Sequence, residues 1–471
     1  MTHGPEAKDE LRHLPVINGR VARSSIRTDG QRVRVDPADT RGRFIRARRV
    51  VFVILIVAWI LLPLIPIGGH PALFLDVDTR RFYVLGQVFN AQDTWLVFFL
   101  VTGAGFGLVY TTALLGRWWC GWACPQTVFL ESFYRPIQRL VMGPREARLR
   151  LRARGGPAVF ARRLLTHALY GVASVVVAHI FVGYFVSLPK LWAMMHEHPG
   201  AHATTFAWML ALSLLFYVDF GIFREQFCVV LCPYGRLQSV LLDDDSLVVG
   251  YDDARGEPRG KGKTKAAGRG DCVDCGRCVV VCPTGIDIRN GLQIDCIACA
   301  QCVDACDEIM DKLGRAPGLV RYDSLRGLRG EARRILRPRM VVYTGFLIAG
   351  IVAATLGFRK HEAFEANLLR LPGAPFTRDE GRIRNGFEIH LVNKSARPES
   401  FHVAPEEGAK ETFIVPIADV TLEPLASQRL PVFVTVPQAD FTHDHPIRLV
   451  IARGGPRPEK RVLSATFLGA R

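Results

Sequence analysis

The densest group of cysteines in the chain begins with Cys272-Val-Asp-Cys275-Gly-Arg-Cys278-Val-Val-Val-Cys282-Pro283 and continues with Cys296-Ile-Ala-Cys299-Ala-Gln-Cys302-Val-Asp-Ala-Cys306. Two-residue gaps let three thiolates of one run converge on a single four-iron, four-sulfur cubane, while the fourth thiolate reaches the other cluster. We therefore predict two [4Fe-4S] clusters with crossed ligands. Cluster one takes Cys272, Cys275, Cys278 and Cys306, and cluster two takes Cys282, Cys296, Cys299 and Cys302. Paired cysteines also bind zinc, but this doubled spacing makes zinc the weaker interpretation.

Two further cysteine pairs share the pattern Cys-x-x-x-Cys-Pro. One is Cys120-Gly-Trp-Ala-Cys124-Pro125, the other is Cys228-Val-Val-Leu-Cys232-Pro233, and each follows a long apolar run. Residues four apart share a helix face and proline cannot continue a helix, so we expect each pair to present two thiols where an apolar helix ends. Four soft sulfur ligands favour Cu(I), or a further iron–sulfur centre, over hard cations. The alternative is that all four are small buried residues, as free cysteine often is.

Five apolar runs are long enough, or nearly so, to cross a bilayer. They lie at about residues 50–67, 94–116, 164–188, 205–223 and 340–358. Arginines are concentrated before the first run, in 145–163 and in 326–339, which the positive-inside rule assigns to the cytoplasm. Five spans then put the C-terminus on the periplasmic side. We attribute the net charge of +16 to this topology and expect no nucleic-acid partner.

These patterns predict a membrane α-helical protein with five transmembrane helices, a two-cluster ferredoxin-like α+β insert and a C-terminal all-β immunoglobulin-like sandwich. Alternating runs at 387–391, 432–436 and 447–451 predict strands of the sandwich. All twelve cysteines lie between Cys120 and Cys306, which favours reduced ligands in the cytoplasm over exported disulfides. The predicted divisions are 1–49, a basic cytoplasmic arm; 50–223, four transmembrane helices with the Cys120/Cys124 loop; 224–339, a cytoplasmic region with the ferredoxin-like module at about 265–312; 340–358, the fifth helix; and 359–471, the periplasmic domain.

Several histidines, one aspartate and three tryptophans could have either a functional or a purely structural role. His167, His179 and Asp219 fall inside apolar runs and are candidates for a metal, proton or quinone role, although a hydrogen bond to a neighbouring helix explains a histidine equally simply. Six histidines in the expected periplasmic regions are copper candidates, but solvated loop histidines are the better interpretation. They are His70, His196, His198, His202, His443 and His445. Trp118, Trp119 and Trp122 are predicted to form an interfacial belt.

Taken together, these motifs resemble the FixG/CcoG (RdxA) family of cytochrome c oxidase accessory proteins with a 4Fe-4S ferredoxin-type domain. The resemblance runs nearly end to end and rests on Arg117–Thr127, Phe223–Arg236, Tyr251–Arg259 and Cys306–Lys312. It implies a multi-pass protein of the bacterial cytoplasmic membrane that supports assembly of cbb-type cytochrome oxidase. It also implies a cupric reductase activity that supplies Cu(I) to the heme-copper centre, with the oxidase or its copper chaperones as partners and an unknown electron donor.

We therefore hypothesise that the two clusters transfer electrons, and that Cys120, Cys124, Cys228 and Cys232 bind and reduce copper as the substrate ion. Two alternatives stay open. The first is a quinol-oxidising electron conduit like the NapH or NosR membrane ferredoxins, which place similar Cys-x-x-x-Cys-Pro motifs near helix ends. The second is a non-enzymatic assembly scaffold, in which the periplasmic domain docks the oxidase or a chaperone and the clusters only stabilise the fold.

Overall fold

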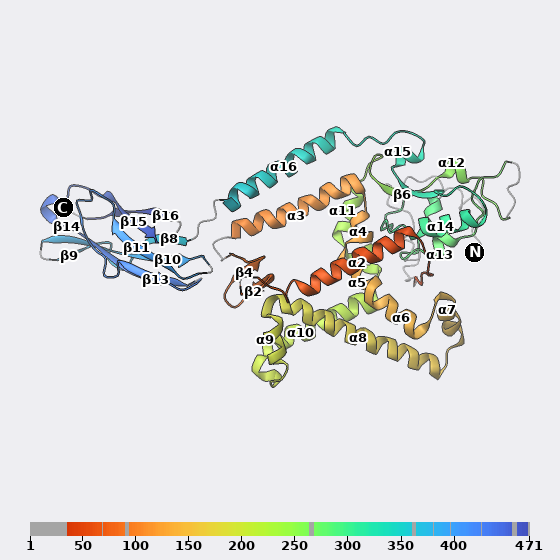
Figure 1. The fold of residues 1–471 in the computed structure, drawn as a ribbon, viewed down its shortest axis with the longest axis horizontal. Coiled ribbons are helices and arrows are strands. Elements are labelled where there is room, and N and C mark those ends of the chain that lie inside the picture. The colour runs from red at the N-terminus through yellow and green to blue at the C-terminus, as the bar shows by residue number, and fades with distance from the viewer. Residues whose placement is uncertain are drawn as a thin grey trace. The chain divides into compact units, whose positions relative to one another are not determined.

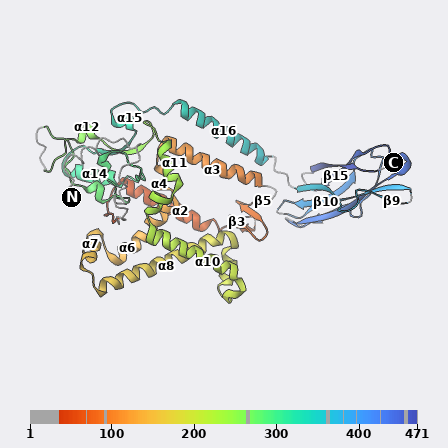
Figure 2. The same cartoon turned by 180° about the vertical axis from the view of Figure 1, so that it is seen from behind.

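The structure, a computed structural model, describes residues 35–67, 69–89, 94–262, 268–359, 364–379, 381–395, 397–424, 426–454 and 459–469. Residues 1–34 of the predicted basic arm lie outside this description. The chain divides into two compact units. One unit combines Met1–Ile65 with Phe98–Ala353, and the other combines Pro66–Val97 with Ala354–Arg471. Figures 1 and 2 show the helices of the first unit and the strands of the second from two sides.

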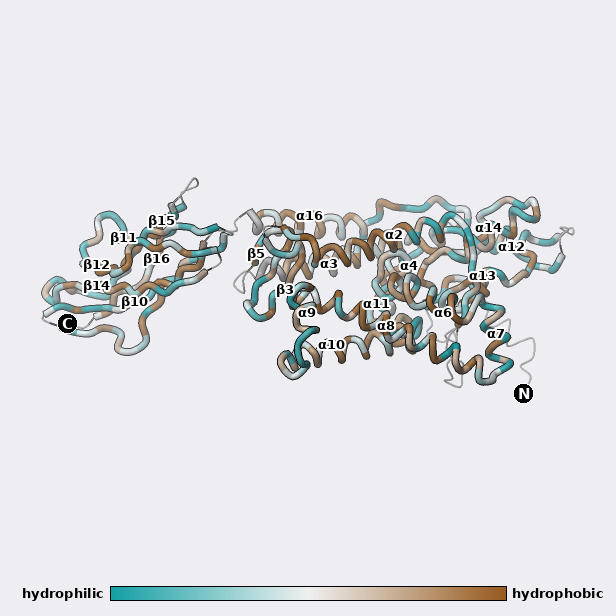
Figure 3. The backbone as a smooth tube through the Cα atoms, turned by 60° about the horizontal axis from the view of Figure 1, so that its bottom comes forward, coloured by the Kyte–Doolittle hydropathy of each residue, from teal (hydrophilic) through white to brown (hydrophobic). Residues whose placement is uncertain are grey.

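Five long helices overlap the predicted spans: α2 (Arg43–Leu61), α3 (Thr94–Leu115), α8 (Pro157–Val186), α10 (Ala203–Phe216) and α16 (Pro338–Arg359). The end of the first predicted span, at residues 66–67, is a strand and not part of a helix. Helix α10 continues into a π-helical segment, Tyr217–Phe223. Among the described residues, four stretches are long and apolar enough to cross a membrane: Phe98–Leu115, Pro157–Val186, Pro199–Phe223 and Pro338–Leu356. Helix α2 begins with several arginines, so its apolar part is shorter and the fifth span stays a prediction. Figure 3 shows continuous hydrophobic colour along much of α3 and α8.

Short helices connect these long ones. They are α4 (Trp118–Trp122), α5 (Pro125–Phe129), α6 (Arg135–Met142), α7 (Arg145–Arg154), α9 (Leu188–Met194) and α11 (Pro233–Leu241), with π-helical segments at Leu130–Tyr134 and Phe227–Leu231. Aromatic side chains pack where the segments meet: Tyr134 is fully buried and stacks on Phe220, with ring centroids 5.1 Å apart. This packing holds the segment Leu130–Tyr134, which leads into α6, against the segment Tyr217–Phe223, which follows α10.

The cysteine-rich module follows α11. Strand β6 (Val248–Tyr251) pairs antiparallel with β7 (Val320–Asp323), and helices α12 (Asp253–Gly256), α13 (Arg277–Val280), α14 (Gln301–Lys312) and α15 (Leu325–Leu328) complete it. Each cysteine run leads into one helix, α13 or α14. Val249 and Val320 of the two strands belong to the same buried cluster as the cysteines. Both strands lie outside the predicted module at 265–312, so its core extends further along the chain.

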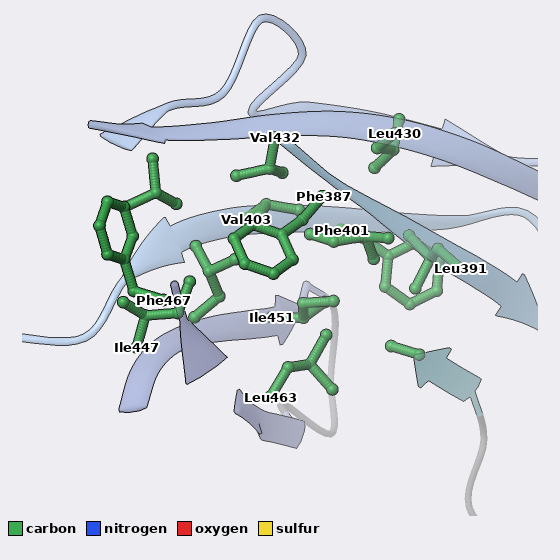
Figure 4. Close-up of a cluster of buried hydrophobic side chains, with 14 of the residues drawn as sticks. Phe387, Leu391, Phe401, Val403, Leu430, Val432, Ile447, Ile451, Leu463 and Phe467 are labelled. Carbon is green, nitrogen blue, oxygen red and sulfur yellow. The ribbon is translucent and has the colours of Figure 1, made fainter. Parts of the chain in front are cut away.

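The C-terminal part is a sandwich of two antiparallel sheets. One sheet has the order β12 (Thr412–Ile414), β14 (Ser427–Pro437), β10 (Arg382–Asn393) and β8 (Phe364–Arg370), with β9 (Thr377–Asp379) also on β10; the other has β13 (Asp419–Leu422), β11 (Glu399–Pro405), β15 (His445–Arg453) and β16 (Glu459–Phe467). Alternate residues of β10 and β14 point toward those of β11, β15 and β16 and form the core between the sheets (Figure 4). The three predicted strands lie within β10, β14 and β15.

Five short strands lie in residues 66–67 and 70–89. They are β1 (Pro66–Ile67), β2 (His70–Pro71), β3 (Leu73–Asp76), β4 (Arg81–Val84) and β5 (Gln87–Phe89). The last three form one antiparallel sheet, in which Tyr83 and Val88 are buried and Phe74 packs on them. Strands this short carry too little alternation to be recognised in a single sequence.

Candidate redox site

Two cavities in the cysteine-rich module are lined by the eight cysteines of the doubled motif. One is lined by Cys272, Cys275, Cys278 and Cys306, and the other by Cys278, Cys282, Cys296, Cys299 and Cys302. Cys306 thus lies beside cysteines of the first run and Cys282 beside those of the second, whereas Cys278 lines both cavities. The crossed ligand sets stay a prediction. Five of the eight cysteines are buried and only Cys275 is exposed. The four or five thiols around each cavity fit the donor set of a [4Fe-4S] cluster.

Burial makes these thiols reluctant to ionise. It raises the pKa of Cys296 and of Cys306 to about 12 and that of Cys299 to about 11, and neighbouring thiols reinforce the shift. Iron is ligated by the thiolate, so loading the module must release protons. The thiols therefore stay protonated until a positively charged metal centre binds in place of the protons.

The module is fastened to the first long helix. Asp304, which lies on α14 between two cluster cysteines, accepts hydrogen bonds from the backbone N–H groups of Phe44 (3.2 Å) and Ile45 (2.8 Å). These N–H groups belong to the open first turn of α2, where a carboxylate also meets the positive end of the helix dipole. The approach is so close that a Cβ on Gly42 would overlap Asp304. Helix α14 therefore caps α2.

The two Cys-x-x-x-Cys-Pro segments differ from the expected geometry, because neither pair lies on the last turn of an apolar helix. Helix α3 ends at Leu115, and Gly116, at φ +60°, turns the chain into α4, which carries Cys120. Cys124 is extended (φ −62°, ψ 127°) and precedes α5, whose first residue is Pro125. Proline suits the first position of a helix because its missing N–H would lack a partner there anyway. The proline begins a helix here instead of ending one.

The second segment repeats this path. Arg224, at φ +58°, takes the place of Gly116, and Cys228 lies in the π-helical segment Phe227–Leu231. Cys232 is extended (φ −66°, ψ 110°) and precedes α11, which begins at Pro233. Each segment thus holds one thiol inside a short helix and one on the residue before the next helix.

The four thiols of these segments come together. Burial raises the pKa of Cys120 to about 12, and the charges of Cys124 and Cys232 contribute to the shift. Burial likewise raises the pKa of Cys228, with added contributions from Cys124, Cys120 and Cys232. Among the described residues, however, no three His, Cys, Asp or Glu side chains are close enough to hold one metal ion. A single ion bound by three of these thiols would therefore require side-chain movement.

Helix α4 lies directly against the loop that carries Cys296 and Cys299. A Cβ on Gly121 would lie only 2.4 Å from the carbonyl oxygen of Ile297, so the two backbones approach as closely as glycine allows. Arg117 donates to the carbonyl oxygen of Cys296 (3.3 Å) and to that of Gly235 (2.8 Å). Burial lowers the pKa of Arg117, and the charges of Cys296 and Cys120 oppose that shift. This guanidinium therefore lies between cluster two and the Cys120 segment.

A second contact extends from the same helix. Trp122 Nε1 donates to the hydroxyl of Tyr322 (3.0 Å), and that hydroxyl donates to the carbonyl oxygen of Ala298. Trp122 is 8% exposed, so its expected place in an interfacial belt is wrong: the side chain packs against the module. Sequence patterns assign no role to Gly121 or Tyr322, because Gly121 contacts the Ile297 loop and Tyr322 bonds Trp122, each of which lies far away in the sequence. Only the position of Gly121 inside the motif could have drawn attention to it.

The intramembrane candidates have different surroundings. His179 Nδ1 lies 2.8 Å from the carbonyl oxygen of Val175 in its own helix, and His167 Nδ1 lies 3.0 Å from the Tyr217 hydroxyl. Asp219 accepts a hydrogen bond from Gln126 Nε2 (3.0 Å). Its charge also acts on the thiols of Cys124 and Cys228. Asp219, but not His179, therefore lies near the thiol site, which is the group of four thiols in the two Cys-x-x-x-Cys-Pro segments.

The loop histidines have local partners. His70 stacks on Tyr83 with centroids 4.0 Å apart, His202 Nε2 lies 2.7 Å from Glu197, and His445 Nε2 lies 3.0 Å from Glu411. The backbone N–H of Gly200 donates to His198 Nδ1 (3.1 Å), while His196 Nδ1 lies 2.9 Å from the Trp192 carbonyl oxygen. His443 lies near His445, with ring centroids 6.4 Å apart. Within the described part of the chain these histidines form no group of three metal ligands.

Family models match most of the chain. A "4Fe-4S dicluster domain" matches residues 223–325, and a "4Fe-4S binding domain" matches 96–142 and 201–243, which contain both Cys-x-x-x-Cys-Pro segments. Residues 354–470 match the "IG-like fold at C-terminal of FixG, putative oxidoreductase". The ferredoxin-type region and the immunoglobulin-like sandwich predicted from the sequence are thereby confirmed.

Relatives match over nearly the full length. The nitrogen fixation protein FixG of Rhizobium meliloti is 33% identical, over 99% of this chain and 98% of the relative. Protein RdxA of Cereibacter sphaeroides is 33% identical over 85% of this chain and 88% of its own, and protein RdxB of the same organism is 32% identical over 82% and 81%. A crystal structure of a FixG-related protein from Vibrio parahaemolyticus covers 23% of this chain and 97% of its own, at 11% identity and a TM-score of 0.21.

Proposed function

The chain belongs to the family of FixG and RdxA, and from that premise we propose that it reduces Cu(II) to Cu(I) for the assembly of cbb-type cytochrome c oxidase. Membership, the 4Fe-4S domains and the apolar helices make it an iron–sulfur redox protein of the inner membrane. The copper substrate and the individual roles below are our proposal. Each turnover moves one electron to one Cu(II) ion, which leaves as Cu(I).

In this proposal the eight module cysteines hold two [4Fe-4S] clusters, with Cys272, Cys275, Cys278 and Cys306 on one and Cys282, Cys296, Cys299 and Cys302 on the other. When bound, such clusters supply single electrons at low potential. Burial of the cysteines excludes water, and Arg117 places a positive charge beside cluster two. Cys120, Cys124, Cys228 and Cys232 bind the copper, because soft thiolates stabilise Cu(I) over Cu(II).

One observation carries the proposal: helix α4, which bears Cys120, touches the loop between Cys296 and Cys299 through Gly121. Electron transfer to a bound ion requires a short, packed path. The Gly121 contact and the Trp122–Tyr322 hydrogen bond supply such a path between the two groups of cysteines. A scaffold that used its clusters only for stability would have no need of this arrangement.

We further propose that the N-terminus and the clusters face the cytoplasm and the C-terminal sandwich faces the periplasm, as the arginine distribution predicts. The sandwich would then be the surface that meets the oxidase or its copper chaperones. The electron donor in the cytoplasm or membrane is unknown.

A second candidate is an iron–sulfur centre held by the four thiols themselves. The match of residues 96–142 and 201–243 to a 4Fe-4S binding domain favours it. So does the absence, among the described residues, of any three such side chains close enough to hold a single ion. In this case the chain would be an electron conduit, and quinol-dependent reduction would distinguish it from a cupric reductase.

One pair of variants separates these functions. We expect Cys120→Ser with Cys124→Ser to abolish copper reduction in anaerobic protein while the iron content stays that of two clusters. Cys228→Ser with Cys232→Ser, at the matched positions, should do the same. A fall in iron by about a third in both variants would show a third cluster instead, and unchanged copper reduction would overturn both assignments.

A further inference from the structure

A cavity of about 490 Å³ lies between helix α2, residues 37–40, helix α6 and the start of α14. Its size is within the range of small-molecule sites. Six arginines line it: Arg48, Arg49, Arg135, Arg139, Arg148 and Arg224. The same lining includes Ile45, Phe52, Val53, Ile56 and Phe133. The cavity is therefore strongly basic in one part and apolar in another.

The basic part retains positive charge. Among the described residues, two carboxylates, Asp39 and Glu131, share the lining with the six arginines. Asp36 lies behind it 3.7 Å from Arg148, and Glu225 lies 3.8 Å from Arg135. These four carboxylates are fewer than the arginines, so an anion would still be attracted.

Several of the lining arginines are buried. Arg48 is 2% exposed, and Arg135 and Arg148 are each 7% exposed. Each has a buried guanidinium nitrogen without a hydrogen-bond partner: Nη2 of Arg48 and Nε of the other two. Buried donors of this kind normally have a partner, so a small movement of these side chains toward the cavity would let an anion there supply one.

The lining residues of α2 show which kind of anion fits. Ile45, Arg48, Arg49, Phe52, Val53 and Ile56 follow one another at steps of three and one residues, so they share one face of the helix. Along this face two arginines are followed by two apolar turns. Val53, on the apolar part, is 60% exposed. A ligand lying along the face would have an anionic head and an apolar tail.

We propose that this cavity binds an anionic phospholipid, with its phosphate at Arg48, Arg135 and Arg148 and an acyl chain along Phe52, Val53 and Ile56. Guanidinium groups bind phosphate oxygens strongly, and basic pockets between membrane helices hold anionic head groups. The inference goes beyond the proposed function and takes from it only the entry of α2 into the membrane. A neutral quinol head would leave the positive charge unused.

The lipid would also support the redox site. Arg48 Nε donates to the carbonyl oxygen of Gly121 (2.8 Å), the residue that touches the cluster-two loop. The charge of Arg48 also acts on Cys299. A phosphate on Arg48 therefore braces the contact between α4 and the module.

The test is native mass spectrometry of the full-length protein released from nanodiscs of phosphatidylglycerol or of phosphatidylcholine. The lining variant is Arg49→Gln with Arg139→Gln, because both side chains are exposed enough for folding to tolerate the changes. The matched control, Arg46→Gln with Arg150→Gln, removes two exposed arginines that are outside the lining. We expect the wild type and the control to retain phosphatidylglycerol and not phosphatidylcholine. The lining variant should retain at least tenfold less phosphatidylglycerol than the wild type.

Several results would overturn the proposal. Equal retention of phosphatidylglycerol by the lining variant and the control would show that the lipid does not bind in this cavity. Equal retention of phosphatidylcholine by the wild type would show that no anion is recognised. Complete displacement of the lipid by millimolar inorganic phosphate would identify free phosphate as the ligand, and a co-purified quinone lost only from the lining variant would identify a quinone. Iron content, measured on the same samples, reports the redox site separately.

Discussion

The two Cys-x-x-x-Cys-Pro segments follow the same backbone path but have different neighbours. Aligned on their cysteines, they pair Gly116 with Arg224, Arg117 with Glu225, Gly121 with Val229, Trp122 with Val230 and Pro125 with Pro233. The shared features are the residue at positive φ, the short helix and the proline that begins the next helix. The cysteines and prolines therefore build the thiol site, and the residues between them determine what each segment touches.

The pair Gly121 and Val229 shows this difference most clearly. Val229 is buried, so a β-branched side chain fits this position of the repeat. At Gly121 even a Cβ would meet the Ile297 carbonyl oxygen. Glycine is needed in the first segment only because the cluster-two loop approaches there. The first segment is therefore the one that packs against the cluster-two loop, and our proposal makes it the electron entry to the four thiols of the two segments.

Substituting Gly121 should have the largest effect on stability and on copper reduction, and substituting Val229 is the matched comparison. Gly121→Val should push the Ile297 loop away, destabilise the protein by about 3 kcal/mol through overpacking, and slow copper reduction at least tenfold. Val229→Ala, the matched change, should cost only about 1 to 2 kcal/mol and leave the rate within twofold. Thermal unfolding and anaerobic copper-reduction assays measure both. Equal effects of the two variants on the rate would remove the distinction between the segments.

Neutralising Arg117, the arginine of the first segment, should have an intermediate effect. Arg117→Gln removes a positive charge beside Cys296, so the reduced, more negative form of cluster two becomes less stable. Its midpoint potential should fall by roughly 60 mV, a tenfold change in the electron equilibrium. Redox titration followed by electron paramagnetic resonance measures the potential. Arg117→Lys should restore most of it, whereas Glu225→Gln at the matched position should not lower it; a fall in Glu225→Gln as large as in Arg117→Gln would contradict a special role for the first segment.

Removing the aromatic hydrogen bond should have the smallest effect. Trp122→Phe loses the bond to Tyr322 and should cost about 1 kcal/mol of stability. A double-mutant cycle with Tyr322→Phe should give a coupling energy of about 1 kcal/mol, since the two side chains interact directly. Additive effects of the two substitutions on unfolding would show that the hydrogen bond contributes nothing to the docking of α4.

Much of this architecture could be predicted from the sequence, because its signals are local. The spacing of the eight module cysteines predicts two sets of four ligands, and two cavities lined by these cysteines lie in the module. The strands 387–391, 432–436 and 447–451 are evident from alternation, and four apolar helices from length and hydropathy.

The rest depends on contacts between distant segments. Whether a proline ends one helix or begins the next depends on where the chain turns, and the turns at Gly116 and Arg224 have no shared residue type to reveal them. The burial of Trp122 depends on Tyr322, which carries no motif. Helix α2 combines arginines with an apolar stretch, so hydropathy alone does not establish it as a span.

The most direct test of the account follows cluster absorbance and Cu(I) formation together. Anaerobically reduced protein is mixed with Cu(II) in a stopped-flow instrument, with a Cu(I) chelator present. We predict that the wild type loses cluster reduction and forms Cu(I) at the same rate, one ion per electron. The Cys120→Ser, Cys124→Ser variant should keep its iron and its reduced clusters and form no Cu(I). Cu(I) formation at the wild-type rate in that variant would contradict electron transfer through the thiol site.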